Sequence, residues 1–440
     1  MTRKLTLLSF LALFFFVQVS LAQTFNKAKL DSLLDALAAN NKAMVSIAVT
    51  KNGQPLYSRA IGYSWYGPTK TQANTKTKYR IGSISKVFTA TMIFQLIEAG
   101  KLQLSTPLSR FYPQIPNAAK ITIAQMLNHS SGIHSFTDSS YTSWLSQKVT
   151  PAILLSKMMK PDFEPGAKHE YSNSNFVLLG YIVEKLDKQP YAASLKKRIT
   201  GKIGLKDTYY GGKITAANNE AYSYNWQGDW KPDTETDMSI PGGAGALVST
   251  PNDLVKFMHA LFAGKLVSQT SLTQMKTVKD GYGMNFFPYT FYNETGYGHN
   301  GGIDGFQSQA VFYPKDSITV AYVANGVNYS LNTMMIGLLS IVHNKPYQIP
   351  DFKKVSLKAE DVVKHAGVYS STQLPLKITI STKDNVLVAQ ATGQSSFEME
   401  AVDINTFRFD IAGIVIKFDT LKNQLTLLQG GQTFLFTKEK

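Results

Sequence analysis

The first stretch that could do chemistry is a serine followed three positions later by a lysine, Ser83 and Lys86. Apolar residues recur at helical spacing from Ile84 to Ile97, which predicts a buried helix with Ser83 at its cap and Gly100 at its end. Side chains three residues apart share one face of a helix, so the Lys86 amine can approach the Ser83 hydroxyl. A serine beside an amine is a nucleophile beside a possible base.

A second pair at the same spacing, Ser194 and Lys197, shows that this spacing alone is a weak signal. We interpret its surroundings as an ordinary basic surface helix. Ser83 differs because two further polar motifs follow it in the chain, Tyr171-Ser172-Asn173 and His299-Asn300-Gly301.

In this order, Ser-x-x-Lys, Tyr-x-Asn and His-x-Gly resemble the motifs of the serine β-lactamase and penicillin-binding-protein family. Tyrosine in the middle motif is similar to class C β-lactamases, D-aminopeptidases and family esterases. The resemblance spans roughly Phe25 to Val342 and includes the stretches 126–132 and 241–245. It implies an α/β (α+β) fold, with an antiparallel sheet flanked by helices and an all-helical lobe.

The resemblance also implies a role for each motif residue. Ser83 would be the nucleophile, and its base would come either from a Lys86 amine made neutral by burial or from Tyr171 with a pKa lowered by the Lys86 charge. Asn173 would hold Lys86 in place and accept the substrate amide. The oxyanion hole would consist of the backbone N–H groups of Ser83 and Gly302, donors that are typically worth ~3–4 kcal/mol each.

The third motif places His299 and Gly301 at the substrate. His299 stands where many relatives have lysine, so we expect a group that titrates near neutrality in place of a fixed positive charge. Such a site would favour substrates without an obligatory carboxylate. A second His-x-Gly, at His365, is interpreted as a decoy, and His129 is expected to have a structural hydrogen-bonding role.

The composition of the 440-residue chain limits the remaining classes. With 44% hydrophobic residues it can bury large cores. Its net charge of +15 is spread without a dense basic run, which favours an unspecialised surface over affinity for an anionic wall polymer, and no nucleic-acid partner is expected. The chain has no Cys, so it has neither disulfides nor a thiol nucleophile. The seven histidines are dispersed, and no metal or cofactor is expected.

The N-terminus has the pattern of a secretory signal peptide over residues 1–22. Arg3 and Lys4 precede an apolar run from Leu5 to Val19, and small residues follow up to Ala22, where we expect cleavage. The run is short for a membrane span, so we expect a secreted or periplasmic protein without a stable membrane anchor.

The mature chain is predicted to contain a hydrolase domain over 23–345, a linker over 346–355 and a C-terminal domain over 356–440. The first domain should open with a helix over Lys27–Asn40 and a hairpin turning at Asn52-Gly53, and end with a helix over Asn332–Val342. Residues 208–241 should form loops and short strands near the mouth of the site. Beyond the linker, apolar residues alternate with a period of two after a helix near Ala359–His365, which predicts a small β-barrel-like domain that resembles a lipocalin-like tail.

The function that follows is that of a secreted serine hydrolase, which forms an acyl-enzyme at Ser83 with small amides or esters. D-aminopeptidases, peptidases and esterases are the implied types. The alternatives are a true β-lactamase or D-Ala-D-Ala carboxypeptidase, and a non-catalytic wall-binding or sensing homologue. The expected partner is a small molecule or short peptide, with cell-wall fragments as one candidate.

Overall fold

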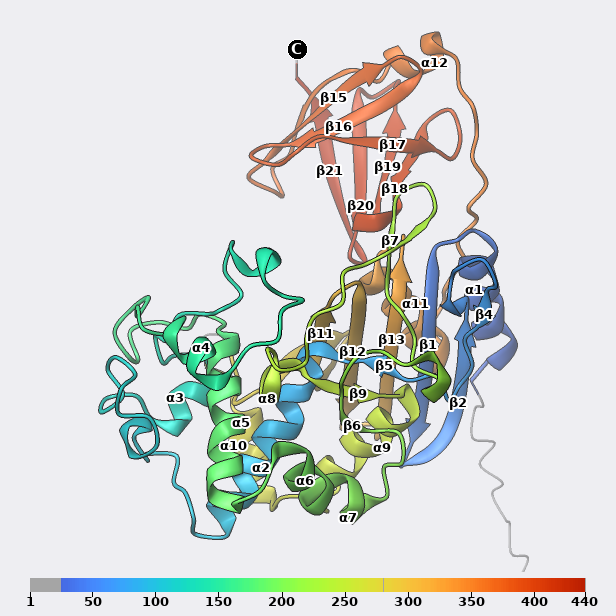
Figure 1. The fold of residues 1–440 in the computed structure, drawn as a ribbon. Helices are drawn as coiled ribbons and strands as arrows, with labels where there is room; N and C mark the ends of the chain where they lie inside the picture. Colours follow the sequence, from blue (N-terminus) through green and yellow to red (C-terminus); the bar gives the residue numbers. More distant parts are fainter. Residues whose placement is uncertain (1–24, 280, 440) are drawn as a thin grey trace, which may run out of the picture.

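The computed structural model describes residues 25–279 and 281–439, and their fold is shown in Figure 1. The expected signal peptide and its cleavage site at Ala22 lie outside the described residues. Within the described ranges, none of the helices combines the length and the apolar character needed to span a bilayer.

An antiparallel sheet forms the centre of the first domain, as the sequence predicts. Asn52 and Gly53 have φ values of 52° and 74°, which a tight hairpin turn of this kind requires. Strand β7 (Tyr224–Trp226) pairs with β8 (Trp230–Pro232) and joins the sheet beside β13. The main order is β10 (Phe287–Phe291), β11 (Glu294–Ile303), β12 (Phe306–Tyr313), β13 (Ile318–Val327), β1 (Ala43–Lys51) and β2 (Gln54–Ile61).

The sheet separates two hydrophobic cores. Strand β1 is buried along nearly its whole length, because helices cover both of its faces. One face carries α1 (Lys27–Ala39) and α11 (Leu331–Val342), which confirm the first and last expected helices. The other face carries α2 (Ser85–Glu98), α5 (Asn173–Asp187) and α9 (Pro251–Phe262).

Short helices complete the lobe around α5, which lies beside the sheet in Figure 1. These are α3 (Ile123–Leu127), α4 (Pro151–Ser156), α6 (Tyr191–Leu195), α7 (Gly201–Ile203), α8 (Gly242–Gly245) and α10 (Gln269–Lys276). The expected mixture of loops and short strands over 208–241 is also present, with β7 and β8 within it.

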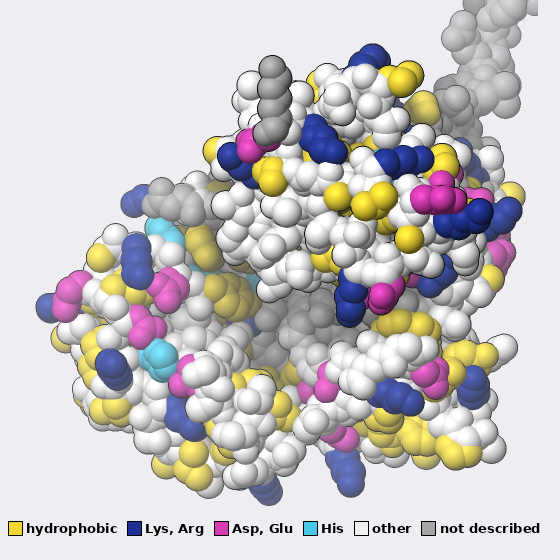
Figure 2. All heavy atoms as spheres, turned by 90° about the horizontal axis from the view of Figure 1, so that it is seen from above, with side chains coloured by type: hydrophobic (Ala, Val, Ile, Leu, Met, Phe, Trp, Pro, Cys, Tyr) yellow, Lys and Arg dark blue, Asp and Glu magenta, His cyan; other side chains and the backbone are white. Residues whose placement is uncertain are grey.

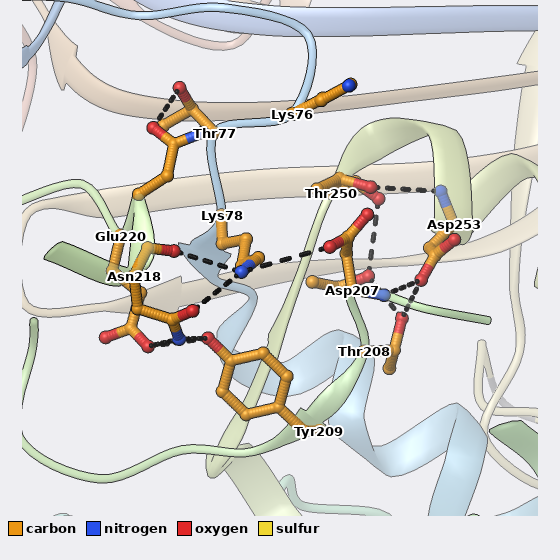
Figure 3. A network of polar contacts seen from close by, with 12 residues as sticks. Lys76, Thr77, Lys78, Asp207, Thr208, Tyr209, Asn218, Glu220, Thr250 and Asp253 are labelled. Atoms are coloured by element: carbon orange, nitrogen blue, oxygen red, sulfur yellow. Dashed lines mark hydrogen bonds and ion pairs between the residues drawn. The ribbon is translucent and has the colours of Figure 1, made fainter. Parts of the chain in front are cut away.

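A small sheet holds the strand that leads into Ser83. Its strands are β5 (Tyr79–Arg80), β9 (Leu247–Ser249) and β6 (Tyr209–Tyr210), in that order; β3 (Tyr63–Trp65) and β4 (Thr71–Gln72) pair separately. A polar network lies beside it, in which Lys78 Nζ donates to Asn218 Oδ1 at 2.9 Å and lies 3.9 Å from an Asp207 carboxylate oxygen (Figure 3). The network joins segments that are far apart in the sequence and so fixes the path of the chain into Ser83.

The C-terminal domain is a closed eight-stranded barrel, in agreement with the predicted all-β tail. Helix α12 (Ala359–Val363) precedes it and is two residues shorter than expected. The interior of the barrel is a packed core that includes Phe407, Phe418 and Phe436. The strands are β14 (Gly367–Ser370), β15 (Lys377–Lys383), β16 (Val386–Ala391), β17 (Phe397–Ala401), β18 (Thr406–Phe409), β19 (Ile414–Asp419), β20 (Gln424–Gln429) and β21 (Gln432–Lys438).

Buried charges join the barrel to the first domain. Lys42, at the start of β1, forms an ion pair with Asp410 at 2.5 Å, and the Lys42 side chain is only 6% exposed. Arg408 donates to the backbone carbonyl oxygens of Asp351 and Phe352 in the connecting segment. Seen from above, basic and acidic side chains intermingle, and the surface is hollowed between the barrel and the helical lobe (Figure 2). The barrel therefore contacts the first domain directly, through Asp410, and also binds the connecting segment through Arg408.

Candidate active site

Ser83 and Lys86 lie together at the start of the buried helix. The Lys86 Nζ and Ser83 Oγ atoms are 2.8 Å apart, as the three-residue spacing predicts. The expectation that Ser83 caps the helix is wrong, because residues Gly82–Ile84 form a 3-10 turn and α2 begins only at Ser85. The Ser83 hydroxyl is instead engaged by the Lys86 amine.

Two glycines let strand β11 approach this turn closely. A Cβ atom added at Gly301 would lie 2.2 Å from the Ile81 carbonyl oxygen and 2.9 Å from the Ser83 nitrogen. Gly82 has a φ of 50°, and a Cβ atom there would lie 2.8 Å from the Gly302 carbonyl oxygen. The backbones of Ser83 and Gly302, which we expect to form the oxyanion hole, are therefore close neighbours.

The Lys86 amine has two further partners. Asn173 Oδ1 and the Ala244 carbonyl oxygen each lie 2.8 Å from Nζ, and the side chain is fully buried. Burial lowers the pKa of Lys86 well below its ordinary value, because the charged form loses its hydration. A neutral amine has two N–H bonds and one lone pair. If the N–H bonds serve the two carbonyl-type acceptors, the lone pair is left for the Ser83 hydroxyl.

Tyr171 lies on the other side of the nucleophile. Its ring centroid is 5.0 Å from Lys86 Nζ. Burial raises the pKa of Tyr171 above its ordinary value, and the neighbouring Ser83 hydroxyl offsets this only in part. Of the two ways of making a base that the sequence leaves open, the geometry favours a neutral Lys86 over an ionised Tyr171.

His299 lies beside Tyr171 but does not titrate as the sequence suggests. The ring is 2% exposed, and its centroid lies 5.0 Å from that of Phe287 in an edge-on arrangement. Burial and the nearby Lys86 lower the pKa of His299 to about 3, so the expectation of titration near neutrality is wrong. His299 Nδ1 donates to the Asn300 carbonyl oxygen, which can only accept; Nε2 is then an unprotonated acceptor with no hydrogen-bond partner among the described residues.

A cleft of about 390 Å³ opens in front of Ser83. None of the described residues that line it is Lys, Arg or His, whereas Asp233 and Asp304 both line it. Asp304 accepts hydrogen bonds from the Arg80 guanidinium at 2.8 Å and from the Thr236 backbone N–H at 3.0 Å. These partners compensate its negative charge. The full lining is Ser83, Phe136, Thr137, Tyr141, Thr142, Leu145, Asn173, Asp233, Thr234, Thr236, Pro241, Ala244, Gly245, Gly302, Ile303 and Asp304.

Sequence reasoning missed Arg80, Asp233 and Asp304. Arg80 is 2% exposed and also pairs with Glu235 at 2.6 Å, so it joins the 233–241 loop to the end of β11. Nothing in the local sequence indicates that Arg80 meets a carboxylate 224 positions later.

The two decoy motifs, at Ser194 and at His365, are not part of the site around Ser83. Ser194 is buried and accepts from Gln189 Nε2 at 3.2 Å, while Lys197 is exposed, so the expectation of a simple surface helix is wrong for the serine. His365 is buried in the barrel, where its Nε2 lies 2.9 Å from the Ile404 carbonyl oxygen.

One group of described residues could in principle hold a metal ion, but it lies away from Ser83. It comprises Glu294, Asp316 and His343, and Glu294 begins β11 seven positions before Gly301. Glu294 is also paired with Lys315 at 3.3 Å, which competes with a cation for the carboxylate. The chemistry around Ser83 does not involve this group.

Comparison with known proteins finds relatives that match most of the first domain. The family described as "Beta-lactamase" matches residues 30–334. The putative penicillin-binding protein PbpX of Bacillus subtilis is 29% identical over 327 residues, which cover 73% of this chain and 78% of that protein. Penicillin-binding protein 4* of the same organism is 25% identical over 413 residues, covering 85% of this chain and 90% of that protein.

Solved structures also resemble this chain. The D-amino acid amidase of Ochrobactrum anthropi SV3 in complex with L-phenylalanine is 28% identical, with a TM-score of 0.59 over 68% of this chain and 90% of that chain. The octameric penicillin-binding protein homologue of Pyrococcus abyssi covers 93% of this chain and 99% of its own, with a TM-score of 0.65. At 22% identity, the second likeness concerns the fold alone.

Proposed function

Because this chain belongs to the β-lactamase family of serine hydrolases, we propose that it hydrolyses small amides or esters through an acyl-enzyme at Ser83. The observation that carries the proposal is the buried Lys86 amine, 2.8 Å from Ser83 Oγ and bound to two acceptors. A deprotonated amine at hydrogen-bond distance from a serine hydroxyl is the arrangement that nucleophilic attack needs.

The proposed reaction uses the lone pair of Lys86 first. As Ser83 Oγ bonds to the substrate carbonyl carbon, its proton passes to Lys86 Nζ, and the developing oxyanion accepts from the N–H groups of Ser83 and Gly302. The bond to the leaving group then breaks. Tyr171 gives its hydroxyl proton to that group and regains one from Lys86. Water attacks the ester in the same way, and Ser83 recovers its proton as the acid leaves.

The charges around the cleft support substrates without an obligatory carboxylate. The cleft lining has no basic side chain among the described residues, and Asp233 adds a negative charge. His299 is held neutral with Nδ1 engaged by the Asn300 carbonyl oxygen, so its unprotonated Nε2 can accept a hydrogen bond but gives no attraction to an anion. These features favour uncharged esters and amides that carry a free amine over penicillins and peptides ending in a carboxylate.

We also propose that the protein is secreted, on the basis of the apolar run and small residues before position 23. The test is N-terminal sequencing of protein recovered from the producing cells and from their medium or periplasm. A mature N-terminus near Gln23 supports export, whereas an intact Met1 in the cytoplasmic fraction argues against it.

The central test is a substitution pair, Ser83→Ala and Ser194→Ala. We expect Ser83→Ala to abolish hydrolysis of p-nitrophenyl acetate and D-Ala-p-nitroanilide, and Ser194→Ala to keep it, because only Ser83 has an amine within reach. Intact-mass and peptide mass spectrometry with a fluorophosphonate should locate the adduct on Ser83. An adduct elsewhere, or no labelling of folded protein, refutes the proposal and favours the non-catalytic alternative.

L-Ala-p-nitroanilide and nitrocefin complete the substrate panel. Slow turnover of nitrocefin relative to the ester and the D-amide is the expected result. Fast turnover of nitrocefin assigns the enzyme to the true β-lactamases.

A further inference from the structure

His129 contacts the Tyr171 loop in three ways. The Glu170 backbone N–H donates to the His129 carbonyl oxygen at 2.9 Å, and the Ser172 backbone N–H donates to His129 Nδ1 at 3.1 Å. The two ring centroids of His129 and Tyr171 lie 4.3 Å apart, with their planes inclined by 23°. The two residues that flank Tyr171 and the tyrosine ring itself are therefore all held by one histidine.

The local backbone makes this contact possible. His129 follows α3 and has a φ of 60°, which turns the chain so that its carbonyl and its ring both face the Tyr171 loop. Few residues other than glycine, asparagine and aspartate adopt such a conformation readily, although histidine is among those found there. The ring is 2% exposed and also lies against Phe176, with 5.3 Å between the centroids.

The hydrogen bonds also fix the state of the imidazole. A backbone N–H can only donate, so Nδ1 must be unprotonated and Nε2 must carry the hydrogen. Burial lowers the pKa of His129 well below its ordinary value, which keeps the ring in this neutral form. A proton on Nδ1 would replace the bond to Ser172 with a repulsion between two donors.

We propose that His129 is a positioning residue, which holds the Tyr171 hydroxyl at Ser83 by fixing the backbone on both sides of the tyrosine. This inference rests on the proposed role of Tyr171 in the hydrolysis. It concerns a residue that is not among the described residues lining the cleft. It extends the active site beyond the three motifs, to a histidine more than 40 residues before the tyrosine.

Two substitutions separate the contacts. His129→Asn offers an acceptor oxygen near the position of Nδ1 and tolerates a positive φ, whereas His129→Phe keeps a ring to stack but removes the acceptor. We expect His129→Phe to lower kcat on p-nitrophenyl acetate about 10- to 100-fold with KM nearly unchanged, because small displacements of catalytic groups have effects of this size. His129→Asn should recover most of kcat.

The decisive measurement is a double-mutant cycle with Tyr171→Phe. If His129 acts through Tyr171, adding His129→Phe to Tyr171→Phe lowers kcat no further. Losses that multiply in the double variant overturn the inference, as does a His129→Phe variant with the wild-type rate per site labelled by fluorophosphonate. Because the rates are expressed per labelled site, misfolding of part of a variant cannot imitate either result.

His365→Phe supplies the matched control. His365 is a buried histidine in the barrel, stacked on Phe418 with centroids 4.2 Å apart and planes inclined by 22°. Its replacement should lower the melting temperature and leave kcat per site unchanged. An equal loss of kcat in His365→Phe and His129→Phe overturns the inference. If wild-type protein neither turns over the ester nor labels at Ser83, the proposed function fails instead.

Discussion

The Lys86 amine shows how one residue combines a structural and a chemical role. Its two hydrogen bonds to Asn173 and Ala244 link α2 to α5 and α8, while its third contact reaches the nucleophile. The same burial that costs the charged form its hydration creates the base. Stability and activity therefore depend on the same protonation state.

This dependence predicts how stability changes with pH. Between the lowered pKa and the ordinary value of about 10.4, Lys86 is neutral when folded and protonated when unfolded. The unfolded state then binds one more proton, so the free energy of unfolding rises with pH by up to about 1.4 kcal/mol per unit. Lys86→Met should remove this slope in urea titrations between pH 7 and 9. Lys197→Met, at an exposed lysine, should keep it, and identical slopes in wild type and Lys86→Met would show that Lys86 is charged in the folded protein.

His299 leads to a second prediction at the level of single residues. With its pKa lowered to about 3, the imidazole stays neutral from pH 5 to 8, so the ratio of kcat/KM for a penicillin to that for p-nitrophenyl acetate should not change through this residue. An ammonium at ~4 Å from a carboxylate is worth ~4 kcal/mol at an effective dielectric of 20, whereas the neutral imidazole, with its N–H bound to the Asn300 carbonyl oxygen, has no donor left for an anion. His299→Lys should therefore raise the ratio at least about tenfold.

The ratio cancels titrations that both substrates share, Lys86 included. His299→Gln, which also lacks a charge, serves as the control and should keep the wild-type ratio. A wild-type ratio that rises steadily towards pH 5 and loses this rise in His299→Gln would contradict the neutral imidazole.

At the level of secondary structure, the close approach of β11 to the 3-10 turn at Ser83 depends more on Gly301 than on Gly302. Gly301→Ala would place a methyl group 2.2 Å from the Ile81 carbonyl oxygen, whereas at Gly302 the nearest atom lies 3.9 Å away. We expect Gly301→Ala to slow the labelling of Ser83 by a small fluorophosphonate about 100-fold, since it displaces the oxyanion site. Gly302→Ala should label at nearly the wild-type rate, and equal losses in the two variants would refute this account.

Some of these features could be predicted from the sequence, and others could not. The helix at Ser83, the hairpin at Asn52 and the barrel follow from local periodicity and turn chemistry, and the motif order brings Lys86, Tyr171 and Asn173 to Ser83. The state of His299 could not be predicted, because it depends on burial of the ring, which packs edge-on against Phe287 from another strand. The cap at Ser83 failed for a local reason, since Gly82–Ile84 form a 3-10 turn before α2 and the nearby Lys86 engages the hydroxyl.

At the scale of the whole molecule, the connection between the domains is itself part of the first core. Tyr347 and Phe352 pack against the cluster that includes α1 and α11, and Phe352 is only 6% exposed. We propose that the first domain folds without the barrel, but that the cut must spare these residues. Truncation after Asn344 should cost at least about 3 kcal/mol from two lost aromatic side chains, whereas truncation after Lys354 should keep the melting temperature close to that of the full chain.

Urea unfolding and Ser83 labelling of both truncated forms check this prediction. Equal stability of the two forms would show that the segment adds nothing to the core. An insoluble Lys354 form would show that the first domain needs the barrel.

The burial of Lys86 also determines how reactive Ser83 is before the chain folds. A nascent or extended polypeptide leaves this amine in water, where its pKa is near 10.4 and it is protonated at physiological pH. Ser83 then has no base and is as inert as any surface serine. Reactivity arises only when α5 and α8 close over the amine and expel water. The nucleophile is thus latent during synthesis and becomes reactive only as the chain folds around Lys86.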